Sequence, residues 1–345
     1  MKIILILKDY NNGFWETYPP GQKYSISLDV EFIKKYFIKM GYNVRETSYA
    51  EFDFQESYQD FFVIYGSSED PIGGTKDYIE DVLLWLQEKG AVLIPGFKYF
   101  RAHHNKVFME MLRKNFHEKR LKNIESQPYR SPDDIQEKLL NYPLVIKASS
   151  GAGSSGVYLA KNGKELFEYS KRISKIPSMR ANLIWLLRRI KRALEGREPP
   201  PSRYNVKFLV QKFIPNLVGD YKVLIFGDHY FVLHRLNRKN DFRASGAGIF
   251  APPVNEELYG ILDYAKMCVG EISAPCISLD IGIANKECYL FEFQCISFGF
   301  KTMSWAKEFF EYNNDGCLWE KNAFSNIPEE EFCYAVNKYI NENYL

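Results

Sequence analysis

The stretch 142–161, YPLVIKASSGAGSSGVYLAK, constrains the fold more than any other part of the 345-residue chain. It starts with an apolar run that ends at Lys147, and a loop of only small residues follows. Apolar residues resume at Val157 and stop before Asn162-Gly163, and this β-branched, aromatic and apolar run predicts a second strand. The stretch therefore predicts two strands joined by a glycine-rich flap.

The glycines of the flap, Gly151, Gly153 and Gly156, fit the spacing GxGxxG. In a dinucleotide-binding fold this motif opens a helix and an acidic residue lies about twenty positions further on, and neither is found here. A P-loop is excluded because no Lys-Ser or Lys-Thr follows the last glycine, and a protein kinase because the chain has no HRD or DFG sequence. Two interpretations remain: backbone N–H groups that cradle phosphate oxygens beside Lys147, or a tight hairpin whose glycines serve only the turn.

Composition bounds the class of protein. The chain is 46% hydrophobic and 16% aromatic, as in a well-packed globular protein, and 45 basic against 43 acidic residues give no argument for nucleic acid as a partner. No apolar run approaches the roughly 20 residues of a membrane span, and the start, MKIILILKDY, resembles a buried strand and not a signal peptide. Six cysteines without a CxxC pair predict reduced thiols and a cytoplasmic location.

Residues 1–100 alternate between strand and helix patterns, with strands expected at 3–7, 61–65 and 91–94 and helices at 28–39 and 78–89. This alternation predicts an open parallel sheet whose ligand crevice lies at the carboxyl ends of its strands. The loops 11–22 and 66–75 leave strand ends, so they are either substrate loops or solvated connections. A single helix is expected over 101–114, with Val107, Met111 and Leu112 on its apolar face.

The segment 171–203 differs from its surroundings, with ten basic residues against Glu195 and Glu198. Within it, Leu183, Leu187, Ile190 and Leu194 share one helical face, and a proline-rich linker follows. The segment is interpreted either as a packed helix with a solvated basic face or as a docking surface for an anionic partner, a polymer or a membrane-associated acceptor.

From residue 206 onward the chain is rich in strands, with hairpin turns expected at Gly227-Asp228 and Asn285-Lys286 and helices at 265–270, 304–312 and 329–343. Asp280 and Glu292 are carboxylates in apolar strands that face each other across a hairpin, a costly placement unless they are paired or bind a metal. They form a hard-oxygen site suited to Mg²⁺ that carries a nucleotide phosphate, and Gln294 adds an amide oxygen on the same face. Other groups suit the nucleotide itself: a hinge for an adenine edge (Gln211, Lys212, Phe213, Ile214), a carboxylate for hydroxyls (Asp220), and guanidinium forks for phosphate (Arg235, Arg243).

In this order, the residues from Lys106 to Gln294 resemble the ATP-grasp superfamily over nearly the whole chain. The resemblance implies an α/β (α+β ATP-grasp) fold: an open parallel α/β domain over 1–100, followed by two α+β subdomains that clamp ATP. The first subdomain, 101–205, carries the flap and the basic helical insertion 171–205, and the second, 206–345, carries the metal site.

The resemblance also implies roles for single residues. Lys106 and Lys147 look like the two ATP-contacting lysines, Asp220 matches the ribose contact, and Lys222 stands where many relatives carry Arg. The sequence FRAS at 242–245 is similar to the phosphate-binding FR(S/T)N element of the ribosomal-protein glutamate ligase-like branch, while FEFQ departs from the usual E-x-N at Gln294. The implied phosphate loop is Ser149, Ser150, Gly151, Gly153, Ser154 and Gly156, the implied catalytic cations are Lys222, Arg235 and Arg243, and the implied metal ligands are Asp280, Glu292 and Gln294.

Most members of the superfamily are carboxylate–amine or carboxylate–thiol ligases. The resemblance therefore implies ATP and one or two Mg²⁺ ions, with Mn²⁺ as an alternative, and a carboxylate and an amine from small molecules, glycans or peptides as substrates. The product would be an amide in secondary or cell-surface metabolite assembly. The alternatives are a small-molecule kinase and a non-catalytic nucleotide-binding protein, and the oligomeric state is left open.

Overall fold

The structure is a computed structural model that describes residues 2–9, 12–15, 27–67, 74–136, 140–151, 156–175, 178–238, 243 and 249–345. The chain divides into two compact units, one formed by 1–103 together with 217–345 and the other by 104–216. The first hundred residues thus share a unit with the last part of the chain, whereas the sequence pattern divides the chain at 100 and 205. No helix in the described ranges is long and apolar enough to cross a membrane.

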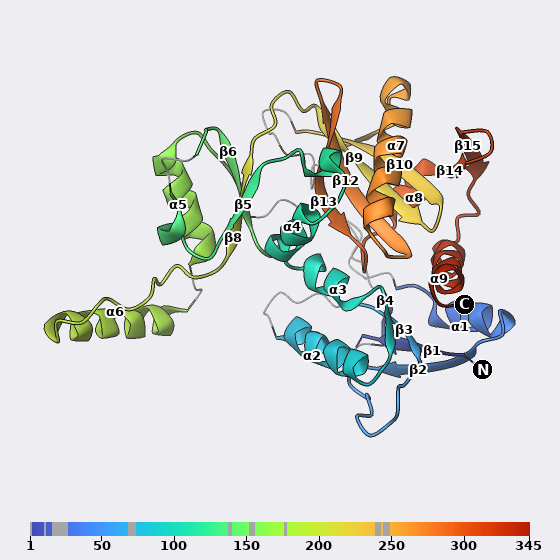
Figure 1. Cartoon of the computed structure of the whole chain (residues 1–345), viewed down its shortest axis with the longest axis horizontal. Helices are drawn as coiled ribbons and strands as arrows, with labels where there is room; N and C mark the ends of the chain where they lie inside the picture. Colours follow the sequence, from blue (N-terminus) through green and yellow to red (C-terminus); the bar gives the residue numbers. More distant parts are fainter. Residues whose placement is uncertain are drawn as a thin grey trace. The chain divides into compact units, whose positions relative to one another are not determined.

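The first unit begins with a four-stranded parallel sheet of order β2-β1-β3-β4 (Figure 1). Asp29 accepts hydrogen bonds from the first N–H groups of α1, which explains where that helix begins. The parallel sheet is confirmed, and β1 and β3 are neighbours whose carboxyl ends lie at the same edge. The elements are β1 (Ile3–Lys8), α1 (Val30–Lys39), β2 (Asn43–Ser48), β3 (Phe62–Tyr65), α2 (Thr75–Glu88), β4 (Val92–Ile94) and α3 (Phe97–His103).

The same unit contains an antiparallel sheet of order β13-β12-β9-β10-β14-β15, with β11 paired to β10. Both expected hairpin turns are present, and Asn285 and Lys286 have positive φ, as a two-residue turn of the primed type requires. The elements are β9 (Gly219–Phe226), β10 (His229–Leu236), β11 (Phe250–Ala251), α7 (Asn255–Glu271), β12 (Cys276–Ala284), β13 (Glu287–Gln294), α8 (Lys301–Ala306), β14 (Glu308–Asn313), β15 (Leu318–Ala323) and α9 (Pro328–Tyr344).

One hydrophobic core joins the two sheets of this unit. Ile4 and Ile64 of the parallel sheet belong to the same buried cluster as Leu224 and Phe226 of β9 and Phe332 of α9. The first hundred residues therefore do not form a core of their own within the described chain, because the central strands β1 and β3 are buried on both faces, as in most parallel sheets, while the edge strand β2 is largely exposed.

The second unit is built on a four-stranded antiparallel sheet of order β5-β8-β6-β7. Leu144, Ile146, Phe208 and Val210 on one face of this sheet are buried with Leu166 of α5. The flap strands are β6 and β7, as the sequence predicts. The elements are α4 (Lys106–Lys114), a 3₁₀ turn at Lys119–Lys122, β5 (Ser126–Tyr129), a second 3₁₀ turn at Pro132–Asp134, β6 (Leu144–Ala148), β7 (Val157–Ala160), α5 (Gly163–Ser174), α6 (Met179–Leu194) and β8 (Phe208–Lys212).

Two of the expected helices are wrong. The helix expected over 101–114 is two helices, α3 and α4, because the side chain of Asn105 caps the N-terminus of the second. Met111 on its expected apolar face is exposed, while Glu110 and Arg113 are buried. The segment 304–312 is helical only to Ala306, where Lys307 in the left-handed conformation ends α8 and β14 begins.

Candidate functional site

Four charged side chains meet on one face of β9, β10 and β12. Asp220 and Arg235 are direct partners across β9 and β10, and Asp280 of β12 is the direct partner of Lys222 of β9. Arg235 donates from Nε to Asp220 Oδ1 at 2.6 Å and from Nη2 to Asp220 Oδ2 at 2.8 Å, and Nη2 also lies 2.9 Å from Asp280 Oδ2. Lys222 Nζ lies 2.9 Å from Asp280 Oδ1, so each carboxylate oxygen of Asp280 has a cationic partner. We call these four residues the charge cluster.

A β-bulge brings Glu292 onto the same face. In β12 and β13 the register shifts between Asp280 and Ile281, so that Asp280 pairs with Glu292 while Ile281 pairs with Leu290. A regular hairpin closed by the same turn would place Asp280 opposite Phe291 and turn Glu292 to the other face. The expected facing of Asp280 and Glu292 is thus confirmed, and Gln294, two residues along, points to the same face.

The two faces of this sheet have different roles. Tyr221, between Asp220 and Lys222, points to the opposite face, where its hydroxyl donates to Glu257 of α7. On the cluster face, Leu224 and Phe226 of β9 are buried in the core shared with the parallel sheet. The face therefore changes along β9 from apolar core to charged site, and α7 covers only the other side.

The charge cluster holds Arg235 and Asp280 in their charged forms, whereas burial raises the pKa of Asp220 above its usual value. Burial alone would raise the pKa of Asp280, but the neighbouring Arg235 and Lys222 outweigh burial and hold that pKa well below its usual range. Burial would lower the pKa of Arg235, but Asp280 and Asp220 outweigh it and hold the pKa above its usual value. The arginine and the Asp280 carboxylate are therefore both charged at neutral pH.

The donor set at Asp280, Glu292 and Gln294 fits a hard divalent cation, because two carboxylates and an amide supply only oxygen. No group of three or more His, Cys, Asp or Glu side chains placed for a metal is found among the described residues, and the third oxygen donor of this set is the amide of Gln294. Three carboxylates and two cations on this face leave a formal charge of minus one within Asp220, Lys222, Arg235, Asp280 and Glu292. These five side chains alone would repel a polyphosphate, whereas a bound divalent cation would make the summed charge of the site plus one.

The described part of the glycine flap contacts Lys106. Lys106 Nζ donates to the carbonyl of Gly151 at 2.8 Å, and the Lys106 N–H donates to the carbonyl of Ser149 at 2.8 Å. Ser149 Oγ in turn donates to Asn105 Oδ1, 3.0 Å away. The sequence-predicted lysine at the start of α4 and the predicted phosphate loop are therefore brought together within one unit.

Glycine is required at both ends of the flap. Gly151 has φ 114° and Gly156 has φ 73°, in the left-handed region that other residues rarely adopt. A Cβ on Gly156 would lie 2.8 Å from the Cβ of Ala148, which donates its N–H to the Gly156 carbonyl. Gly153 and Ser154, which complete the predicted loop, lie outside the described residues, and Ser150 is exposed.

Lys147 and the hinge lie on the sheet of the second unit. The register of β6 and β8 places Lys147 on the same face as Gln211, which is buried and pairs with Ser126 of β5. The Lys212 N–H, which the sequence leaves for an adenine edge, donates instead to the carbonyl of Glu125 at 2.8 Å. Phe213 and Ile214 follow the end of β8, and Ile214 is buried.

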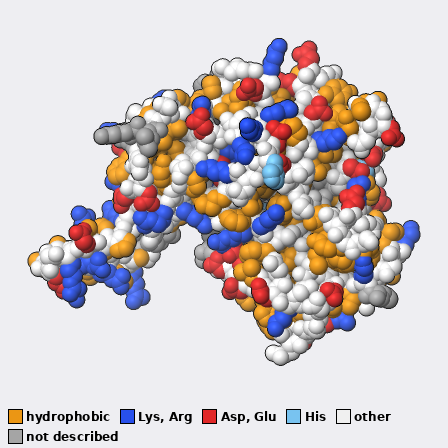
Figure 2. All heavy atoms as spheres, in the orientation of Figure 1, with side chains coloured by type: hydrophobic (Ala, Val, Ile, Leu, Met, Phe, Trp, Pro, Cys, Tyr) orange, Lys and Arg blue, Asp and Glu red, His pale blue; other side chains and the backbone are white. Residues whose placement is uncertain are grey.

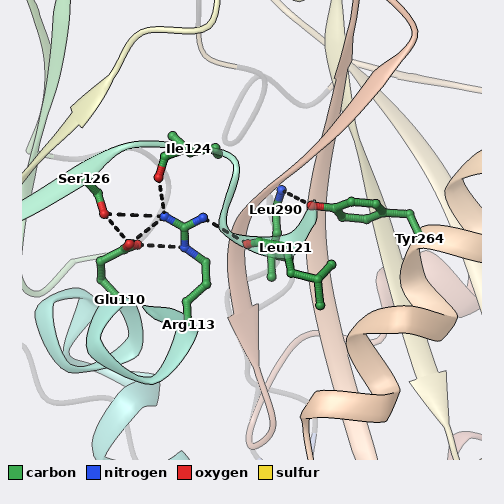
Figure 3. Close-up of polar contacts among 7 residues, drawn as sticks. All are labelled: Glu110, Arg113, Leu121, Ile124, Ser126, Tyr264 and Leu290. Carbon is green, nitrogen blue, oxygen red and sulfur yellow. Dashed lines mark hydrogen bonds and ion pairs between the residues drawn. The ribbon is translucent and has the colours of Figure 1, made fainter. Parts of the chain in front are cut away.

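A buried ion pair on α4 joins this helix to β5 and to the segment before β5 (Figure 3). Glu110 and Arg113 are 1% and 3% exposed, and Arg113 Nε donates to Glu110 Oε2 at 3.0 Å. Arg113 also donates to the carbonyls of Leu121 and Ile124, at 3.1 and 2.8 Å, and Ser126 donates to Glu110. This pair is not among the residues predicted from the sequence, although two opposite charges three residues apart among apolar neighbours are a usable signal.

A second polar region lies at the carboxyl ends of β1 and β3 in the first unit. Asp9 and Ser67 are both buried, and Asp9 Oδ1 and Ser67 Oγ have no hydrogen-bond partner in the described part of the chain. The Ser67 N–H donates to Ser297 Oγ at 2.9 Å, three residues beyond Gln294. This strand edge therefore adjoins the segment that follows β13, and buried polar groups of this kind favour a polar ligand.

The predicted substrate loops 11–22 and 66–75 begin at this edge, and most of their residues lie outside the described ranges. Arg243, the second predicted guanidinium, is described as a half-buried residue whose immediate neighbours lie outside those ranges too. The structure therefore brings together Asp220, Lys222, Arg235, Asp280, Glu292 and Gln294 in one unit, and Lys106, Ser149 and Gly151 in the other.

No family model matches the sequence, and no curated protein matches it significantly. Solved structures do match. The D-alanine–D-alanine ligase from Bacillus anthracis is 13% identical to this chain, and the match covers 99% of this chain and 100% of the ligase. Its TM-score is 0.51, and the structure of the same enzyme complexed with ATP has a TM-score of 0.52. D-cycloserine synthetase DcsG is 11% identical, with coverage of 97% of this chain and 99% of that one and a TM-score of 0.50. With the parallel sheet, the antiparallel sheets and the flap in place, these likenesses show that the chain has the ATP-grasp fold.

Proposed function

We propose that this protein is an ATP- and Mg²⁺-dependent ligase that activates a carboxylate as an acyl phosphate and joins it to an amine. The observation that carries the proposal is the charge cluster with Glu292 beside it, which places two cations and two oxygen ligands on one sheet face. The fold supports the same reading, because the similar structures are a D-alanine–D-alanine ligase and a D-cycloserine synthetase.

The cations of the cluster are preorganised for negative charge. Asp220 holds Arg235 through two parallel hydrogen bonds, so the guanidinium keeps one orientation without reorganising when charge develops on a phosphoryl group. Lys222, paired with Asp280, is the second cation on this face. Both would neutralise charge as the substrate carboxylate attacks the terminal phosphate of ATP, and Arg243 would add a third cation.

Asp280, Glu292 and Gln294 would hold the metal ion through carboxylate and amide oxygens. When bound, Mg²⁺ supplies neutralisation of the phosphate oxygens. Asp280 would then be shared between the metal and its two present partners, Arg235 and Lys222.

The flap and Lys106 would cover the phosphates and keep water from the acyl phosphate, whose hydrolysis would waste ATP. Lys147, on the face shared with Gln211, would contact ATP from the sheet. We assign the substrate side to the strand edge at Asp9 and Ser67, where buried oxygens would accept from an amine or donate to a carboxylate.

Release of ADP tests the proposal. The protein is mixed with ATP, Mg²⁺ and a panel of carboxylates, with hydroxylamine as a general amine and with a panel of amines, and products are identified by mass. ADP release that needs both a carboxylate and an amine, with an amide or hydroxamate as product, is the expected result.

Variants of the metal ligands sharpen this test. Asp280→Asn and Glu292→Gln should lose ADP release and weaken Mn²⁺ binding measured by electron paramagnetic resonance, whereas Glu287→Gln, on the exposed end of the same strand, should retain both. If both ligand variants retain activity and metal binding, the metal assignment is wrong. A stable phosphorylated acceptor would instead identify a kinase, and ATP binding without turnover on any substrate would identify a nucleotide-binding protein.

A further inference from the structure

Helix α6, Met179–Leu194, has none of its 16 residues buried. It lies apart from the four-stranded sheet of its own unit (Figure 1). The interpretation of this segment as a helix packed by its apolar face therefore does not describe the structure. A helix with an exposed apolar face needs a partner or a phase boundary to be stable in that form.

The side chains of α6 are sorted into two faces. At 100° per residue, six apolar residues fall within an arc of about 100°, and all five cations lie outside it, with Ile184 among them. Leu194 is 84% exposed and Leu183 57% exposed, so the apolar face is open to solvent along its length. Its members are Met179, Leu183, Leu186, Leu187, Ile190 and Leu194.

The opposite side of the helix is already covered by the chain itself. Trp185 donates from Nε1 to the carbonyl of Pro201 at 2.6 Å, and the guanidinium groups of Arg189 and Arg203 lie over its ring. Arg192 donates to the carbonyl of Glu198. The proline-rich connector thus braces the polar side of α6 and leaves the apolar face as the surface presented to a partner.

Charge identifies that partner. The helix carries five cations (Arg180, Arg188, Arg189, Lys191 and Arg192) and no acidic residue, although the whole chain has a net charge of only +2. Figure 2 shows Lys and Arg side chains gathered along α6, at the lower left of the view. Two copies of such a helix would repel each other, and a nucleic acid would pair with the cations and leave the apolar face in water.

We propose that α6 is an amphipathic anchor that binds this protein to the surface of an anionic lipid bilayer. The apolar face would enter the acyl boundary while the flanking cations contact lipid headgroups, which is the arrangement that interfacial helices adopt. Sixteen residues with five cations fall short of the roughly 20 apolar residues of a spanning helix, so α6 lies on the membrane and does not cross it. The inference is independent of the ligase reaction.

Vesicle binding by the full chain tests the proposal. The protein is floated with phosphatidylcholine vesicles that either lack or contain phosphatidylglycerol, at low and at high salt. Binding is expected only with the anionic vesicles and should weaken as salt rises, because the headgroup contacts are screened.

Three double or single variants separate the two faces. Leu187→Gln with Ile190→Gln should weaken binding to anionic vesicles about a hundredfold, and Arg188→Gln with Arg192→Gln about tenfold or more. Ala181→Gln, an apolar-to-glutamine change on the polar side of the same helix, should change binding less than about twofold. None of these side chains is buried, so no variant should lower the thermal midpoint by more than a few degrees, and the loss of the hydrogen bond from Arg192 to Glu198 should account for any such change.

Other results would overturn the proposal. Equal binding to neutral and anionic vesicles, or unchanged binding by the Leu187→Gln and Ile190→Gln variant, would contradict it. If the parent protein does not bind vesicles and is a dimer by light scattering, while the Leu187→Gln and Ile190→Gln variant is a monomer, the apolar face joins two copies of the chain. Tight binding to heparin with no vesicle binding would show a purely electrostatic polyanion site.

Discussion

Asp220 and Arg235 face each other across β9 and β10 and form a two-pronged ion pair, with Oδ1 2.6 Å from Nε and Oδ2 2.8 Å from Nη2. The pair is shielded from water and extends to Asp280 through the same guanidinium. It gives the proposed active site an arginine whose position is set by the sheet register. A planar fork of this kind has no substitute among the other side chains.

Arg235→Lys should therefore lower the free energy of unfolding by about 2 kcal/mol, since an ammonium cannot make the paired contacts to Asp220 and the contact to Asp280 together. Urea unfolding measures the loss. Arg130→Lys is the matched control, because Arg130 pairs with Asp134 at an exposed site, and its expected effect is at most about 0.5 kcal/mol. Equal losses in the two variants would show that the buried geometry adds nothing.

Gly219 begins β9 beside this pair, and a Cβ there would lie 2.2 Å from the Arg235 carbonyl oxygen. Because that obstacle is backbone, Gly219→Ala should force the strands apart and lower the free energy of unfolding by about 1–3 kcal/mol. Gly260→Ala in α7 meets no atom within 4 Å and should stabilise the protein by up to about 1 kcal/mol. Both are measured by urea unfolding, and a neutral Gly219→Ala would contradict the tight contact between these strands.

Much of the site could be predicted from residues close in sequence. The two-residue turn at Gly227-Asp228 fixes the register that sets Asp220 opposite Arg235, so even this pair was open to prediction from the hairpin. The bulge beside Asp280 could not be predicted from the sequence, since a register shift depends on how both strands pack. The expected facing of Asp280 and Glu292 depends on that bulge.

Other features depend on contacts between distant parts of the chain. The hydrogen bond from the Lys212 N–H to the Glu125 carbonyl joins β8 to a segment more than eighty positions earlier. No local sequence pattern shows that this hinge N–H already has a partner within the chain. The edge strand β2 was not foreseen, because its NVRETS sequence is polar and only its pairing with β1 makes it a strand. The single helix expected over 101–114 is wrong because Asn105 caps the second helix, and its local sequence does not distinguish a cap from a helical position.

The buried pair Glu110–Arg113 gives a further prediction. Glu110→Gln should lower the free energy of unfolding by about 3–5 kcal/mol, because it leaves the Arg113 guanidinium buried without a counter-charge. Glu31→Gln removes an exposed pair of the same i,i+3 spacing and should cost at most about 0.5 kcal/mol. The double variant Glu110→Leu with Arg113→Met removes both charges and should recover most of the loss. Urea unfolding measures all of these variants, and a double variant as unstable as Glu110→Gln would contradict the cost of the unpaired guanidinium.

The pH dependence of stability should be visible at Asp228, in the turn between β9 and β10. Burial would raise the pKa of this carboxyl, but Tyr334 and Lys338 of α9 outweigh it and hold the pKa below its ordinary 3.8. A folded-state pKa below the unfolded value means that the carboxylate contributes stability above about pH 4 and loses it as pH falls through the folded-state pKa. The melting temperature of Asp228→Asn should thus be lower than that of the parent protein at pH 7 and equal to it at pH 2. A difference in melting temperature that is the same at both pH values would contradict this.

The most direct test of the central claim follows oxygen through the reaction. A carboxylate that supports ADP release is labelled with ¹⁸O in both oxygens, and the inorganic phosphate formed in a single turnover is examined by mass spectrometry. Attack of the carboxylate on the terminal phosphate, followed by displacement by the amine, predicts one ¹⁸O atom in each phosphate. Unlabelled phosphate would contradict the acyl phosphate route, and label retained in a stable phosphorylated acceptor would show phosphotransfer without ligation.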